Sequence, residues 1–105
     1  MRVVDTAGLA VLVASVPCPY RYEVSALADP GVLPRLLELV AKRGLVPTEM
    51  TAHRHGGADG EDRLSVSVGV DGVEPMAAEH IAQCMTQVVG VEAVAFRRLP
   101  RAAAA

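Results

Sequence analysis

The chain has 105 residues, of which 51% are hydrophobic and 21% charged, and its formal net charge is −2 at pH 7. This length suits one domain with a single core and is too short for two independent cores. With so little net charge, two tyrosines, one phenylalanine and no tryptophan, the composition gives no reason to expect a nucleic-acid partner, which would need a basic surface and stacking aromatic side chains.

The N-terminal segment contains an apolar run, residues 9–14, that resembles part of a secretory signal. The run is too short to span a bilayer, and Asp5 and the lack of a convincing small-x-small cleavage site disfavour a signal peptide. We expect residues 1–19 to form an N-terminal appendage, either an extra strand or a flexible arm, without membrane contact. The cysteines, Cys18 and Cys84, fit no CxxC or disulfide-dense pattern, which favours reduced thiols in a cytoplasmic protein.

A strand and a helix come next, joined by the corner Asp29-Pro30-Gly31. Residues 20–28 alternate in polarity, as in a strand with one buried face. Apolar side chains then recur at spacings of three and four, which predicts an amphipathic helix that begins near Gly31 and ends at Gly44. Pro34 fits this helix because it falls in the first turn. The side chains expected to be buried are Tyr20, Tyr22, Val24, Ala26 and Ala28 on the strand and Leu33, Leu36, Leu37, Val40 and Ala41 on the helix.

The second half of the chain predicts two paired strands, a second helix and a last strand. Residues 46–55 form an edge strand, because Pro47 cannot donate to a sheet ladder, and a glycine-rich turn joins them to a strand that ends at Asp71-Gly72. The second helix begins at Pro75 and stops at Gly90, before a last strand over residues 91–97. One face of the edge strand carries Thr48, Met50 and Ala52, and the other carries Glu49, Thr51, His53 and His55. In the strand that follows and in the second helix, the side chains expected to be buried are Leu64, Val66, Val68, Val70, Ala77, Ile81, Cys84, Met85 and Val88.

This order of elements predicts an α+β fold of the ferredoxin-like type, βαββαβ, with two helices on one face of a four-stranded antiparallel sheet. The domain is expected to span residues 20–98, followed by a C-terminal tail over residues 99–105. The other sheet face bears serine, threonine and charged side chains, so it is either wetted or used for association. Because an unpaired strand edge invites another strand, we expect a homodimer with a continuous sheet or the equivalent contact with a partner protein.

These residues resemble the ACT domain, a small-molecule-sensing regulatory module of amino-acid metabolism, and among its members the small regulatory subunits of acetolactate synthase. The likeness spans about residues 20–98. Ala28 stands where valine-responsive small subunits tend to have Asn, and the chain is more similar to the short, single-domain small subunits. The motifs that carry it are Ser25 to Leu33 with Arg35-Leu36, then Lys42 to Leu45 leading into Thr48 to Thr51, and Val88 to Val94.

The resemblance implies a regulatory, non-catalytic role in branched-chain amino-acid synthesis, either through an amino-acid effector or by supporting a catalytic subunit. The effector would sit between two domains near the first strand-helix corner, its carboxylate held by N–H groups around a glycine and its amino group by nearby acceptors. Gly31 matches the family glycine, and Asp29, Gly31, Val32 and Leu33 would line the site. The residues alone leave open an ordinary turn, with Asp29 near the helix N-terminus for capping.

Two other pairs of residues have spacings that suit a metal ion. His53 and His55 share one strand face, and His80 and Cys84 lie one helical turn apart, so each pair could ligate zinc or copper. No set of four ligands converges in the sequence, and we expect no metal.

No nucleophile-histidine-acid spacing, phosphate loop or HExxH motif occurs, so we expect no catalytic residues and no cofactor. A metal-dependent or thiol-dependent binding module on the same fold is the competing interpretation.

Overall fold

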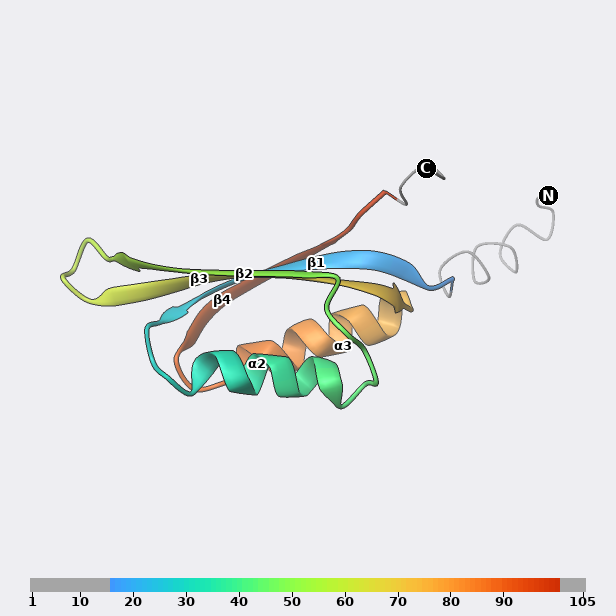
Figure 1. The fold of residues 1–105 in the computed structure, drawn as a ribbon, viewed down its shortest axis with the longest axis horizontal. Coiled ribbons are helices and arrows are strands. Elements are labelled where there is room, and N and C mark those ends of the chain that lie inside the picture. Colours follow the sequence, from blue (N-terminus) through green and yellow to red (C-terminus); the bar gives the residue numbers. More distant parts are fainter. Residues whose placement is uncertain (1–15, 101–105) are drawn as a thin grey trace.

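The structure is a computed structural model that describes residues 16–100. Four strands form one antiparallel sheet in the order β2-β3-β1-β4. Both helices cover the same face of this sheet, and the β2–β3 hairpin reaches beyond them at one end (Figure 1). The predicted ferredoxin-like βαββαβ order is therefore confirmed. The elements are β1 (Cys18–Leu27), α2 (Val32–Ala41), β2 (Glu49–Gly56), β3 (Asp62–Val73), α3 (Pro75–Thr86) and β4 (Val91–Arg98).

β1 is a central strand and supplies the middle of the core. Its alternation is as predicted, since Tyr20, Tyr22, Val24 and Ala26 are all buried against the helices. The Tyr22 side chain is completely buried. Its hydroxyl donates a hydrogen bond to the Ala78 carbonyl on α3 over 2.8 Å, and its ring stacks on that of Phe96 from β4 with 5.8 Å between centroids. One side chain thus connects two strands to a helix.

Helix α2 buries a slightly different face from the one predicted. Val32, Leu36 and Val40, spaced four apart, are fully buried, whereas Leu33 and Leu37 are half-buried and Ala41 is exposed. The inclusion of Ala41 in the buried stripe was wrong. Val32 sets the rotation of the helix, because its Cγ2 lies only 3.2 Å from where a Cβ on Gly90 would be. The predicted stop is confirmed: Gly44 has a φ of 71°, and the Leu45 N–H returns to the Val40 carbonyl.

The β2–β3 hairpin has the predicted faces and the predicted edge. Met50 and Ala52 pair with Val68 and Val66 on the helix side, and β2 is an outer strand of the sheet. However, β2 begins at Glu49 and not at residue 46. Pro47 has no N–H for the ladder, which delays regular pairing until the Thr48 N–H reaches the Gly69 carbonyl at 2.8 Å.

Strand β3 continues through Asp71-Gly72 to Val73, so the prediction that this dipeptide ends the strand was wrong. Gly72 takes a φ of 73°, and the pairing with β1 shifts register between Cys18 and Tyr20. A bulge therefore absorbs the turn residues while the strand goes on.

Helix α3 is also rotated from its predicted face. Its buried residues are Ala78, Ile81, Ala82 and Met85, whereas Ala77, Cys84 and Val88 are half-buried. The hydrogen bond from Tyr22 to the Ala78 carbonyl brings the alanine side of the helix toward the sheet. Gly90, with a φ of 98°, ends the connection to β4.

The ends of the chain fall partly outside the described residues. Of the expected appendage, residues 1–15 lie outside, and β1 already includes Cys18. Of the expected tail, residues 101–105 lie outside. Within residues 16–100 no helix is long and apolar enough to cross a bilayer.

The Tyr22 hydroxyl gives the first testable prediction. At neutral pH, Tyr22→Phe should lower the free energy of unfolding by about 1 kcal/mol, because one buried hydrogen bond is lost. Burial raises the pKa of Tyr22, so the wild-type protein should lose stability once the pH exceeds about 10, where the unfolded tyrosine ionises. The gap between the two proteins should therefore shrink at alkaline pH.

Urea titrations at several pH values measure both effects. Tyr20→Phe is the matched control. It removes a hydroxyl group from the same face of β1, and this hydroxyl forms no hydrogen bond within residues 16–100. Equal losses in the two variants at neutral pH would contradict the assignment to the Tyr22 hydrogen bond.

Candidate functional site

The predicted site lies where β1 turns into α2, and both neighbouring strands brace this corner. The Leu27 N–H donates to the Gly90 carbonyl over 2.8 Å, just before β4. The Ala28 N–H donates to the Asp62 carbonyl over 3.1 Å, at the start of β3. The approach to the corner is therefore fixed by backbone contacts on both sides.

Inside the corner, Asp29 uses two of the N–H groups that the resemblance assigned to an effector. Its Oδ1 accepts a hydrogen bond from the Gly31 N–H at 2.8 Å, and its carbonyl accepts one from the Val32 N–H at 3.1 Å. The turn interpretation is therefore realised in this structure. A carboxylate could bind the Gly31 N–H only by displacing the Asp29 side chain. Otherwise it would have to bind a cationic side chain near the corner.

The four predicted residues are close together but contribute differently. Asp29 is exposed, and Gly31 and Leu33 are partly exposed, so all three can be reached from solvent. The Val32 side chain is fully buried in the core. Val32 can therefore contribute only its backbone to a binding site.

Gly31 provides space rather than an unusual backbone conformation. Its φ of −82° is open to any residue. A Cβ at this position would collide with Arg35 Nη1 and would lie 3.3 Å from Asp29 Oδ1. The glycine thus sits between a guanidinium group and a carboxylate, and a molecule with one negative and one positive group matches that arrangement.

Arg35 was not among the predicted site residues. The sequence analysis named it only within the motif Arg35-Leu36, and its side chain is exposed. The signal that could have found it is its position four residues after Gly31, one helical turn along. A side chain there points back toward the start of the helix, where Gly31 leaves room.

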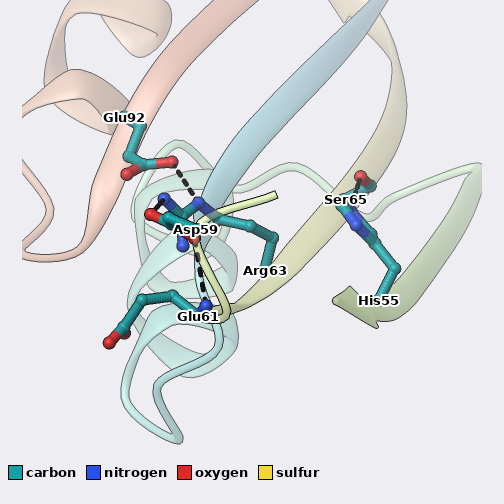
Figure 2. A network of polar contacts seen from close by, with 6 residues as sticks. All are labelled: His55, Asp59, Glu61, Arg63, Ser65 and Glu92. Carbon is teal, nitrogen blue, oxygen red and sulfur yellow. Dashed lines mark hydrogen bonds and ion pairs between the residues drawn. The ribbon is translucent and has the colours of Figure 1, made fainter. Parts of the chain in front are cut away.

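A network of ion pairs supports the same end of the sheet (Figure 2). Arg63, which pairs with Leu27 of β1, donates from Nη2 to Asp59 over 2.8 Å and lies 2.9 Å through Nε from Glu92 of β4. The Glu61 N–H and Arg63 together hold the pKa of Asp59 below its usual value. The turn of the hairpin is thereby tied to β4 beside the corner.

One nitrogen of this network lacks a partner. Arg63 Nη1 is buried and has no hydrogen-bond acceptor within residues 16–100. In the same view, His55 Nε2 lies 2.8 Å from Ser65 Oγ on the next strand (Figure 2). A buried guanidinium nitrogen needs an acceptor, and an ordered water molecule or a ligand oxygen could supply one.

The two pairs with metal-ligand spacing remain pairs. The rings of His53 and His55 stack with 5.9 Å between centroids, and Cys84 Sγ lies 3.5 Å from His80 Nε2. Residues 16–100 contain no group of three or more His, Cys, Asp or Glu side chains placed to hold a metal ion. Cys18 and Cys84 are both free thiols.

Comparison with known proteins identifies the kind of domain. A family model described as the ACT-like domain matches residues 13–103, which is most of the chain. No curated protein matches the chain in sequence.

Several solved structures share the fold at low sequence identity. The ACT domain from GTP pyrophosphokinase of Chlorobium tepidum has a TM-score of 0.61 at 12% identity, over 79% of this chain and 99% of that one. A homoserine dehydrogenase from Thiobacillus denitrificans has a TM-score of 0.66 at 15% identity, over 83% of this chain and 18% of that one. The regulatory subunit of aspartate kinase from Thermus thermophilus has a TM-score of 0.50 at 14% identity, over 80% of this chain and 56% of that one.

The Arg63 network gives the second prediction. Arg63→Gln should release Asp59 and Glu92, so amide hydrogen exchange should become severalfold faster at Gly57 and Glu61 in the hairpin turn. Arg54→Gln is the control, because the ion pair of Arg54 with Asp62 lies on the same hairpin but is more exposed. Similar exchange rates in the two variants would show that Arg63 does not hold the turn.

Proposed function

The chain belongs to the ACT-like domain family, and from this we propose that it is a non-catalytic regulatory module that binds an amino acid at the corner between β1 and α2. Domains of this family are typically regulatory modules of amino-acid metabolism. The regulatory unit would be residues 20–98, with Asp29, Gly31, Val32 and Leu33 at the site. We add Arg35 to these residues because its guanidinium group lies over Gly31.

The arrangement around Gly31 carries the proposal. A zwitterionic amino acid has a carboxylate and an ammonium group on one carbon atom. At the corner, the Arg35 guanidinium, which lies over Gly31, would take the carboxylate, and the neighbouring Asp29 side chain would take the ammonium group. Asp29 Oδ1 is held in place by the Gly31 N–H, which fixes the acceptor before a ligand arrives.

The partner that we propose is the catalytic subunit of an amino-acid biosynthetic enzyme in the cytoplasm, similar to acetolactate synthase. The sequence likeness at residues 25–36 and 88–94 supports this choice, and no catalytic motif was found in the sequence. The similar regulatory subunit of aspartate kinase is another regulatory chain of a larger enzyme. Co-purification with a co-expressed acetolactate synthase catalytic subunit tests this partner. The proposal would be contradicted if neither protein retained the other during purification.

We further propose that two copies pair through β2 to form a homodimer. β2 is an outer strand, and seven of its eight residues are exposed. Its free side can therefore accept a second strand and extend the sheet. The corner is an open surface in a single chain, so a second copy or a partner protein would be needed to enclose an effector.

Binding at the corner is the third prediction. In a thermal-shift screen of the twenty amino acids at millimolar concentration, at least one should raise the melting temperature. Gly31→Asp should abolish the shift, because the new carboxylate would pair with Arg35. Arg35→Gln should weaken binding about tenfold in calorimetry, through the loss of a charge-assisted contact.

Both variants should remain folded, since the backbone at Gly31 suits any residue and Arg35 is exposed. Arg97→Gln, which removes an exposed arginine on β4, is the matched control and should leave binding unchanged. Binding that survives in Gly31→Asp would remove the corner as the site, and a screen without any response would remove the effector.

Self-association is the fourth prediction. Light scattering at micromolar protein concentration should give the mass of a dimer. Proline is tolerated in an outer strand only where the N–H points away from the sheet, and N–H directions alternate along a strand. Of Thr51→Pro and Ala52→Pro, one should therefore yield a folded monomer and the other should lose much of its stability. A wild-type monomer at this concentration would contradict the proposed dimer.

A further inference from the structure

Two hollows adjoin on the helix side of the molecule, at the opposite end of α2 from the corner. The larger, of about 280 Å³, lies where the end of α2 meets the start of α3. The smaller, of about 200 Å³, lies between the two helices. Arg43 and Ile81 line both hollows, so the hollows adjoin, and we call the two together the interhelical cleft.

Positive charge gathers at this cleft. Lys42 and Arg43 line the smaller hollow together with His80, and the larger hollow adds one acidic residue, Glu74. The four ion pairs within residues 16–100 involve Arg21, Arg54 and Arg63, and neither Lys42 nor Arg43 takes part in any of them. Two cations without an ion-pair partner therefore border the cleft.

Apolar side chains form part of the walls of the cleft. Leu39 and Ile81 line the smaller hollow, and Leu45, Val73 and Ala77 line the larger one. A ligand that fits here needs a hydrocarbon part against these side chains and an anionic group for Lys42 and Arg43. The larger hollow has about 280 Å³ and the smaller about 200 Å³, so the ligand is expected to be a small molecule.

We propose that the interhelical cleft is a second binding site, separate from the corner, for a small carboxylate with an apolar chain. Arg43 takes the carboxylate in a two-point contact, since a planar guanidinium matches a carboxylate, and Lys42 adds a second charge. The hydrocarbon chain lies against Ile81 and Ala77. The lining residues include one acidic side chain, Glu74, against the two cations Lys42 and Arg43, so the cleft favours a ligand with a net negative charge.

An NMR titration of the full chain tests this proposal with three probes: isovalerate, 3-methylbutan-1-ol and inorganic phosphate. Isovalerate should shift the amide signals of Arg43, Val73, Ala77 and Ile81 in a saturable way. The alcohol lacks the charge and phosphate lacks the chain, so each should bind at least about tenfold more weakly. Isovalerate should also slow alkylation of Cys84, which lines the cleft, and leave alkylation of Cys18 unchanged.

Three variants test whether isovalerate binds in the cleft itself. Arg43→Gln should weaken isovalerate binding about tenfold. Ala77→Leu should weaken it by filling the larger hollow without a change of charge. Arg97→Gln, the control, should bind like the wild-type protein.

Three results would overturn the second site. They are shifts of equal size with all three probes, isovalerate shifts confined to residues 27–35 at the corner, or unchanged binding in both Arg43→Gln and Ala77→Leu. Because the corner lies at the other end of α2, loss of amino-acid binding in Gly31→Asp would leave the isovalerate shifts in place, and the two proposals can fail independently.

Discussion

The fold depends on the burial of Tyr22 in the central strand. Its ring lies against Phe96 of β4, and its hydroxyl donates to the Ala78 carbonyl of α3, so one residue fixes the distance between the sheet and that helix. Tyr20 is also buried and lies near Phe96, but among the buried side chains of residues 16–100 only that of Tyr22 forms a hydrogen bond. The rest of the core is built from Val, Leu, Ile, Ala and Met side chains, which fill space without forming hydrogen bonds.

The position of the corner follows from this central strand. β1 is paired on both sides, with β3 and β4, and its last residues are held by hydrogen bonds to Asp62 and Gly90. Val32 then packs against Gly90, and Arg35, one helical turn after Gly31, lies over Gly31. The charged group at the corner therefore follows from the spacing of Gly31 and Arg35 along the chain, while Gly90 allows α2 to approach the connection before β4.

The sequence was sufficient to predict the order of elements, the alternation of β1 and the edge position of β2, because these depend on local periodicity and on the missing N–H of Pro47. Periodicity was not sufficient to define the rotation of a helix within about one residue, so Ala41 and Ala77 were placed on buried faces. The bulge at Gly72 depends on which segments come together, and no local pattern encodes it. The contact of Arg35 with Gly31 follows from a spacing of four residues, which the sequence analysis did not use. Asp29 shows the same limit: its position suggested a cap, but only the structure shows that it uses the Gly31 N–H.

The two proposed sites stand at opposite ends of α2, a helix of ten residues. A ligand at one end can affect the other only if the two ends differ together between two states of the protein, and then the coupling must be reciprocal. The corner end is anchored by the Leu27 and Ala28 N–H groups, and the segment after the other end is anchored by the Thr48 N–H on the Gly69 carbonyl. Because backbone hydrogen bonds hold the chain on either side of α2, coupling between the two sites would require the helix to shift as a whole against the sheet.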